Sequence, residues 1–224
     1  NSYHTTNFTR ILNILGNMYK KELLSHKMMK LIWKILKRKK ILSHDGIYIE
    51  SNPYYYNLLN IINFYLEEAK FIAVIRKPKP FIISHIKWER ERLKSTIANK
   101  MVPFWQPTSY FDQLMGLKND YYQRVLFYSK IWAIKNESIL RSVIEKNNTK
   151  ILKFEELFEP ETGVEILQDL TNWMDITLKN PITKQMISKK INYTDENNKD
   201  LWDSQCTTIM KKYCNSLLKE LGYE

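Results

Sequence analysis

Apolar residues recur at helical spacing over several long stretches, and short continuous apolar runs lie between them. Apolar positions three and four residues apart indicate a helix with one buried face. The pattern predicts helices over residues 8–15, 20–38, 54–65, 81–93, 120–146, 163–173 and 201–221. We expect Gly16 to end the first helix. In the second, we assign a stripe of apolar side chains to the core, namely Leu23, Leu24, Met28, Leu31, Ile32 and Ile35.

Three short runs, residues 46–50, 71–75 and 150–154, are typical of strands. The run 71–75 is continuous, apolar and rich in β-branched residues, which predicts a parallel strand buried on both faces. It is followed by a Pro-rich turn and a helix, which is the βα unit of an open parallel sheet. Residues 94–118 and 180–198 lack regular periodicity and are predicted to be irregular. We therefore expect one α/β domain over residues 1–224.

The formal net charge of +11 favours an anionic partner, which could be a nucleic acid, a membrane surface or a small polyanion such as a nucleotide. The densest basic run, residues 34–40, is interpreted as a solvated helix end and not as a nucleic-acid site. Cys206 and Cys214 lie two turns apart on one predicted helix, too far for a disulfide with each other, and no metal-ligand spacing accompanies them. With no apolar run long enough to span a membrane, the expectation is a cytoplasmic protein.

Arg76 and Ser84 are the strongest candidates for a binding site. Arg76 follows the predicted strand 71–75, and ligands of open α/β sheets bind beyond the carboxyl ends of the strands. Its guanidinium can hold a phosphate with two charge-assisted hydrogen bonds, and Ser84 falls in the first turns of the next helix, where anions are favoured. The alternative is that Arg76 only caps the strand and Ser84 lies on a solvated helix face.

The order of the motifs resembles the sulfotransferase superfamily from residue 46 to residue 223. The matching segments are Ile49-Glu-Ser-Asn-Pro-Tyr-Tyr55, Glu68-Ala-Lys-Phe-Ile-Ala-Val-Ile-Arg-Lys-Pro78 with Ser84, Ile151-Leu-Lys-Phe-Glu-Glu-Leu157, Lys189-Lys-Ile-Asn192 and Leu218-Lys-Glu-Leu-Gly-Tyr223. The resemblance implies a P-loop NTPase-like open parallel sheet flanked by helices. It also implies that the cofactor is 3′-phosphoadenosine 5′-phosphosulfate (PAPS), released as adenosine 3′,5′-bisphosphate (PAP). In that family the Arg and the Ser that match Arg76 and Ser84 bind the 3′-phosphate.

The phosphate loop of the family is incompletely matched. The resemblance places Ser2 at its basic position, and Thr5 and Thr6 at its hydroxyl positions, with the preceding strand missing before residue 1. His4 stands where the family has Gly, and a bulky side chain there would hinder backbone approach to a phosphate. The same comparison adds Lys189 and Phe154 to the cofactor site; Phe154 replaces the family's Tyr.

The resemblance also implies a catalytic base: branches of the family use a Glu about twenty residues after the basic loop position, which makes Glu22 the first choice. Glu50 is the second, and His44 and His26 follow. The position of the family Lys after Glu50 is occupied by Ser51.

The aromatic segment 101–111 is a candidate lid over an unidentified hydroxyl or amine acceptor. An inactive sulfotransferase-like module that binds nucleotide, protein or glycan is the alternative to the enzyme. A P-loop kinase is disfavoured, because no Gly-x-x-x-x-Gly-Lys-Ser/Thr motif occurs. No metal and no nucleic acid are expected.

Overall fold

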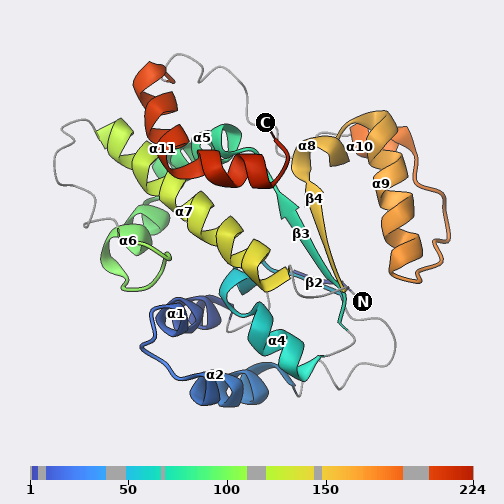
Figure 1. Ribbon diagram of the computed structural model, residues 1–224, viewed down its shortest axis with the longest axis horizontal. Helices are drawn as coiled ribbons and strands as arrows, with labels where there is room; N and C mark the ends of the chain where they lie inside the picture. The colour runs from blue at the N-terminus through green and yellow to red at the C-terminus, as the bar shows by residue number, and fades with distance from the viewer. Residues whose placement is uncertain are drawn as a thin grey trace.

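The computed structural model describes residues 2–4, 9–38, 49–66, 69–109, 120–143, 148–188 and 202–223. They form a mixed α/β fold with four short strands and many helices (Figure 1). The strands are β1 (Ser2–His4), β2 (Ile49–Ser51), β3 (Phe71–Ile75) and β4 (Thr149–Lys153). β1 pairs with β2 and β3 pairs with β4, both in parallel, so the predicted parallel pairing is confirmed, although the described strands form two separate two-stranded sheets.

Three helices build the larger core. α5 (Pro78–Glu91), α7 (Asp120–Val143) and α11 (Ser204–Glu220) pack around Ile75, the last residue of β3. Cys206 and Cys214 are both buried in α11 as free thiols. The other face of β3 is not buried: Ile72 is 39% and Val74 is 50% exposed. The prediction that this strand is buried on both faces is therefore wrong, because its side chains alternate between the helical core and an accessible face.

A second core lies at the other end of the molecule, where α1 (Thr9–Lys20), α2 (His26–Trp33) and α4 (Leu59–Tyr65) pack together (Figure 1). The predicted helix over residues 20–38 is broken by a turn at residues 21–25, followed by α2 and the π-helix η1 (Lys34–Arg38). Ser25 begins α2 by accepting a hydrogen bond from the Met28 N–H. The predicted core stripe is correspondingly wrong in part, since Leu23, Met28, Leu31 and Ile35 are each more than half exposed.

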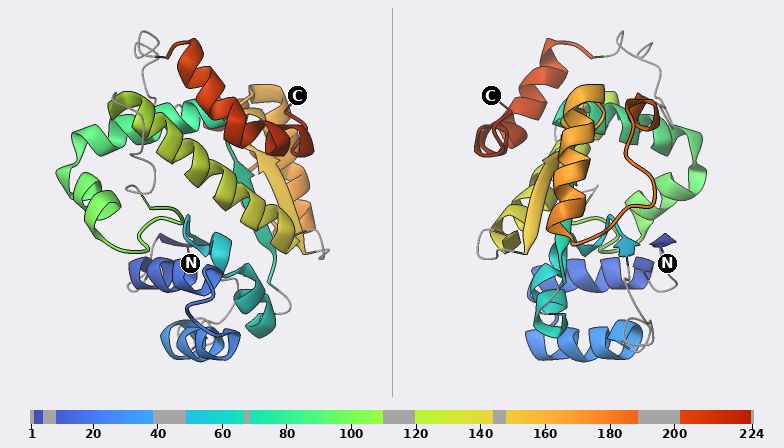
Figure 2. Two further views of the ribbon diagram at one scale, coloured as in Figure 1. Left: turned by 60° about the vertical axis from the view of Figure 1, so that its left-hand side comes forward. Right: turned by 90° about the vertical axis from the view of Figure 1, so that its right-hand side faces the viewer.

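The remaining helices connect and flank these two cores. The 3₁₀-helix η2 (Tyr55–Asn57) follows β2, and α6 (Leu93–Met101) occupies a stretch that was predicted to be irregular. Beyond β4 lie α8 (Phe154–Leu157), α9 (Pro160–Trp173) and α10 (Lys184–Ser188), which pack on one another at the side of the β3–β4 pair away from α7 (Figures 1 and 2). No helix among the described residues combines the length and apolar character needed to cross a membrane.

Gly16 does not end α1, as the sequence suggested, but lies buried inside it, where an added Cβ would meet the Leu58 side chain at 3.3 Å. The helix is closed instead at Glu22, which has a φ of 61°. The Glu22 N–H donates to the Tyr19 carbonyl and the Leu23 N–H to the Met18 carbonyl, the hydrogen-bond pattern of a Schellman C-cap. A non-glycine residue therefore holds a left-handed position at this turn.

Candidate functional site

Arg76 and Phe154 meet at the carboxyl ends of β3 and β4. The two strands pair in register, with Ile75 beside Lys153, so the next residue of each strand emerges at the same edge. The Cζ atom of Arg76 lies 4.9 Å from the centroid of the Phe154 ring, a cation–π contact. The structure thus brings together two of the predicted cofactor residues, and the Phe154 ring supports the guanidinium.

Glu155 and Tyr223 hold the turn that follows β3. The Lys77 N–H donates to Oε1 of Glu155 at 2.9 Å. The Tyr223 hydroxyl lies 2.8 Å from the Ile75 carbonyl oxygen and 3.0 Å from Oε2 of Glu155. Burial and the neighbouring carboxylate of Glu155 raise the pKa of Tyr223, so this phenol remains a hydrogen-bond donor. Two motifs that are far apart in the sequence therefore fix the backbone on which Arg76 is mounted.

Ser84 lies in the second turn of α5, whose first residue is the buried Pro78. The fixed φ of proline favours a helix start, so α5 begins directly after the Arg76 turn. Ser84 is half-buried, and no hydrogen bond joins it to another described residue. The predicted order of strand, Arg76, helix and Ser84 is confirmed, while the bridging of the two side chains by one phosphate stays a prediction.

One face of α7 passes along this region and contributes residues that the sequence did not single out. Trp132 donates from its indole Nε1 to the Arg76 carbonyl at 2.8 Å. Tyr128 lies one turn before Trp132, with its ring centroid 5.3 Å from that of His85, and Lys135 lies one turn after it. The spacing of these three residues places them on the same side of the helix.

Lys135 reaches two tyrosines of the segment that follows β2. Its Nζ lies 5.1 Å from the ring centroid of Tyr56 and 6.0 Å from that of Tyr54. Desolvation lowers the pKa of this ammonium to about 8. Within the described part of the chain, neither Lys135 nor Arg76 has a carboxylate partner. Two cations without counter-charges on neighbouring elements make this region suitable for an anionic ligand.

His85, the residue after Ser84, lies within the electrostatic influence of both cations. Its Nδ1 is 2.9 Å from the Phe81 carbonyl oxygen, and its ring centroid is 3.9 Å from that of Phe81. Burial lowers the pKa of this imidazole to about 4, with smaller contributions in the same direction from the charges of Lys135 and Arg76 and an opposing one from the Phe81 carbonyl. The imidazole is therefore neutral at pH 7 and adds no charge to the site.

Glu50 is the middle residue of β2 and lies beside the middle residue of β1. The parallel register pairs Tyr3 with Glu50 and His4 with Ser51. Oε1 of Glu50 accepts hydrogen bonds from the Tyr55 hydroxyl at 2.7 Å and from Nδ2 of Asn52 at 3.2 Å. These donors orient one carboxylate oxygen of Glu50.

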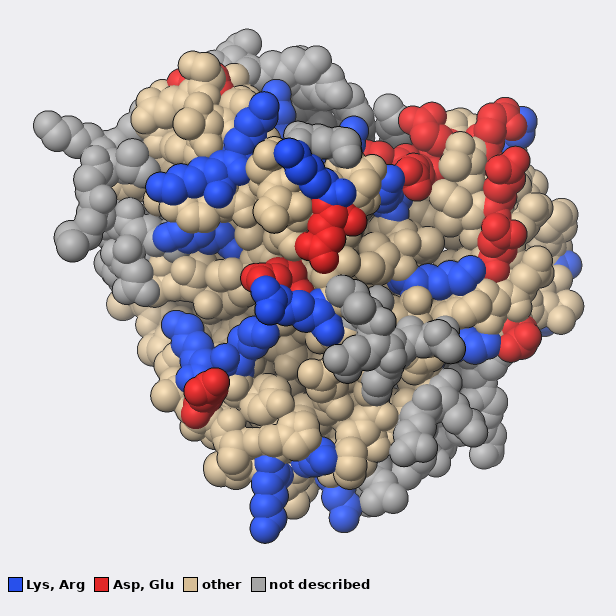
Figure 3. All heavy atoms as spheres, in the orientation of Figure 1, with Lys and Arg blue, Asp and Glu red and all other residues tan. Residues whose placement is uncertain are grey.

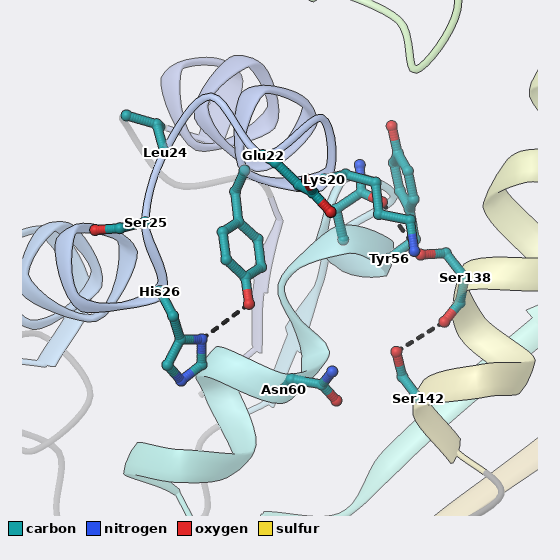
Figure 4. Close-up of a pocket in the computed structure, with 11 residues that line it drawn as sticks. Lys20, Glu22, Leu24, Ser25, His26, Tyr56, Asn60, Ser138 and Ser142 are labelled. Carbon is teal, nitrogen blue, oxygen red and sulfur yellow. Dashed lines mark hydrogen bonds between the residues drawn. The ribbon is translucent and has the colours of Figure 1, made fainter.

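Glu22 lies elsewhere, at the rim of a polar pocket of about 630 Å³ between α1, α2, α4 and α7 (Figure 4). The lining residues are Tyr19, Lys20, Glu22, Leu24, Ser25, His26, Tyr56, Asn57, Asn60, Ser138 and Ser142. His26, a lower-ranked candidate base, has its Nδ1 2.8 Å from the Tyr19 hydroxyl. Tyr56 lines this pocket and also contacts Lys135, but none of Arg76, Ser84 or Glu50 lines it. The structure therefore does not bring Glu22 together with Arg76.

The predicted phosphate loop is shifted by the structure. Ser2 and His4 belong to β1, so their placement on the loop is wrong, and a strand before α1 is present where none was expected. Thr5 and Thr6 lie outside the described residues, as do Lys189 and His44.

The candidate lid is described up to residue 109 and is anchored to α1 by two buried amides. Nδ2 of Asn13 donates to the Trp105 carbonyl at 2.7 Å, and Nδ2 of Asn17 donates to the Phe104 carbonyl at 2.8 Å. Trp105 also packs on Tyr54, with ring centroids 6.4 Å apart. This segment therefore bridges α1 and the tyrosines near Lys135.

No group of His, Cys, Asp and Glu able to hold a metal ion occurs among the residues that the structure describes.

The sequence matches no protein-family model and no curated protein. Among solved structures, the chain is similar to a sulfotransferase domain from the curacin biosynthetic pathway. The two share 13% sequence identity and a TM-score of 0.45, over 94% of this chain and 78% of that chain. A TM-score of this size supports no argument about function.

Proposed function

We propose that this protein is a sulfotransferase with a P-loop-like parallel sheet, in which Arg76 binds the 3′-phosphate of PAPS. The observation that carries the proposal is the position of Arg76. It directly follows β3, stacks on Phe154, is held at its carbonyl by Trp132 and has no carboxylate partner among the described residues. A guanidinium fixed in this way, ahead of a helix N-terminus, is suited to a dianionic phosphate.

Sulfuryl transfer needs positive charge near the transferred group, as phosphoryl transfer does. Residues 5–8, Thr-Thr-Asn-Phe, contain no basic residue, and Ser51 stands where the family has a Lys. We assign this positive charge to Lys135, which lies on α7 and therefore on a different element from residues 5–8 and from Ser51. Thr5 and Thr6 would add hydroxyls, and Lys189 would add a further cation.

The reaction is an in-line displacement that conserves charge and atoms. PAPS supplies a sulfuryl group on a good leaving group. A hydroxyl or amine acceptor forms a bond to sulfur while the bond between sulfur and the phosphate oxygen breaks, and PAP leaves. Glu50 takes the proton of the acceptor, because β2 pairs with β1 and two donors orient the Glu50 carboxylate. Glu22, which lines a different pocket, is the alternative base.

A second candidate function is an inactive sulfotransferase-like module that binds the nucleotide. The absence of a basic residue from the sequence of residues 5–8 favours it, because that residue would otherwise hold the transferred group. Both candidate functions use the Arg76 site to bind the nucleotide, but only the enzyme transfers the sulfuryl group to an acceptor.

Isothermal titration of PAP against the wild type and Arg76→Ala tests the shared site. We expect Arg76→Ala to weaken binding by about 1–3 kcal/mol, the range for a hydrogen-bonded charged group. Lys79→Ala is the matched control, since Lys79 is an exposed cation of the same segment, near the Trp202 ring. Equal affinity of Arg76→Ala and wild type would reject the site. Tight binding without transfer of labelled sulfate to any acceptor in a broad screen would favour the inactive module.

A further inference from the structure

The surface of α2 and η1 exposes an apolar stripe. Met28 is 51%, Leu31 57% and Ile35 67% exposed, whereas Met29 and Trp33 of the same segment are buried in the core. At 100° per residue through α2, positions 28 and 31 fall on one side of the helix and positions 29 and 33 on another, and Ile35 in the π-helical turn that follows is again exposed. The segment therefore has more apolar surface than its own core uses.

Lysines border this stripe. Lys27, Lys30 and Lys34 fall on the third side of the same helix, and no Asp or Glu occurs anywhere in residues 23–40. We call the set of Met28, Leu31, Ile35 and these three lysines the α2 surface. Where α2 lies at the lower end of the molecule in Figure 1, Lys and Arg side chains project from uncharged atoms in Figure 3.

Residues next to α2 add further exposed apolar side chains to this side of the molecule. Leu23, in the turn before α2, is 56% exposed, and Phe64 of α4 is 54% exposed. The Nζ of Lys30 lies 3.2 Å from the centroid of the Phe64 ring, so cationic and aromatic groups are adjacent on this side of the molecule. Aromatic, aliphatic and lysine side chains on one face are the composition of helices that lie in a membrane interface.

We propose that the α2 surface binds the surface of an anionic phospholipid bilayer, with the helix parallel to the membrane plane. The apolar stripe enters the boundary between headgroups and acyl chains, and the lysines contact anionic headgroups. A second copy of the chain is a poorer partner, because two such surfaces would bring their lysines together. A nucleic acid would satisfy the lysines but would leave Met28, Leu31 and Ile35 without an apolar environment.

Vesicle flotation tests this proposal with purified protein. We expect the wild type to float with vesicles of equal parts phosphatidylcholine and phosphatidylserine, and to float poorly with phosphatidylcholine alone. Leu31→Gln/Ile35→Gln should lose at least about tenfold in vesicle affinity, because two buried aliphatic side chains are removed from the interface. Lys27→Glu/Lys34→Glu should lose vesicle affinity by a similar factor. Added salt should weaken the binding of the wild type to anionic vesicles.

Matched controls separate this surface from net charge and from misfolding. Lys211→Glu/Lys212→Glu changes the charge equally on exposed positions of α11, and Met101→Gln alters a residue of α6 that is 74% exposed. Both should float like the wild type, and all variants should unfold at the wild-type temperature. Absence of the wild type from anionic vesicles, or equal loss in the α11 control, would overturn the proposal. So would a wild-type dimer that Leu31→Gln/Ile35→Gln dissociates without lipid, which would assign the surface to a second copy.

Discussion

The indole nitrogen of Trp132 donates a 2.8 Å hydrogen bond to the backbone carbonyl of Arg76, and so joins the middle of α7 to the carboxyl end of β3. This bond fixes where the next turn of α7 lies. Lys135, three residues on, consequently faces the tyrosines that follow β2. In the proposed function, Lys135 therefore supplies from α7 the cation that residues 5–8 and Ser51 do not provide.

Lys135→Met should weaken PAP binding by about tenfold to a hundredfold, since a charged hydrogen-bond donor is lost while the aliphatic stem is kept. The pH dependence is a sharper readout. The lowered pKa of about 8 means that the free protein loses this charge as pH rises through 8, so wild-type affinity should fall above that pH. Titration calorimetry at several pH values should show that the variant lacks this fall.

Lys130→Met is the control for Lys135, because Lys130 is on the same helix with its Nζ 5.3 Å from the Tyr213 ring. It should bind PAP like the wild type and keep the pH dependence. An identical response of the two variants would show that Lys135 acts only through the net charge of α7.

Glu50→Gln should lower the rate of sulfuryl transfer by about 10²–10⁴ with little change in PAP affinity, the loss expected for a general base. Glu22→Gln should leave the rate near that of the wild type, because Glu22 lines the pocket between α1, α2, α4 and α7. Single-turnover transfer of labelled sulfate, measured with both variants, distinguishes the two carboxylates. The opposite ranking would return the role of base to Glu22.

Local patterns were sufficient for the elements nearest the site. The bounds of β3 were predicted residue for residue, since a β-branched run that ends at Arg76 and two prolines has strong signals at both ends. The break in the predicted helix 20–38 was missed, because leucines and lysines continue helical spacing through the turn. Gly16 indicated a helix end, yet it lies inside α1 and packs closely against Leu58, and only the tertiary structure reveals this.

The candidate site was predictable only where its residues belong to ordered motifs. Arg76 and Phe154 were identified in this way, and the structure brings them together. Lys135 was not, because a lysine in an amphipathic helix looks like any solvated residue until the tyrosines beside it are known. The prediction that Ser2 lies in a loop was wrong for a related reason. A segment as short as β1 has no hydrophobic pattern that distinguishes a strand from a loop.

His85 should make the stability of the protein depend on pH. Its pKa is lowered from 6.5 to about 4 in the folded state, so between these values the unfolded chain binds more protons. The free energy of unfolding should therefore fall as pH falls from 6.5 to 4, by up to about 3 kcal/mol. Urea unfolding across this range should show the dependence in the wild type and a smaller one in His85→Asn. His26→Asn, at an exposed histidine, should retain the wild-type slope; a slope lost there instead would contradict the assignment.

Gly163→Ala should destabilise the fold because α8 and α9 meet at this residue. A Cβ at Gly163 would lie 2.4 Å from the carbonyl oxygen of Leu157 and 3.0 Å from its carbonyl carbon, and backbone atoms cannot move aside as a side chain can. We expect a loss of about 1–3 kcal/mol in the free energy of unfolding, the range for overpacking. Gly16→Ala is the matched control, since the nearest neighbours of its new methyl would be side-chain atoms and not backbone, namely Cγ and Cδ2 of Leu58 at 3.3 Å and Cβ of Asn57 at 3.5 Å. The gain in helix propensity, about 1 kcal/mol, should offset that contact. Denaturant unfolding of both variants measures the difference, and equal stability of the two would show that the α8–α9 junction can open enough to accept a methyl group.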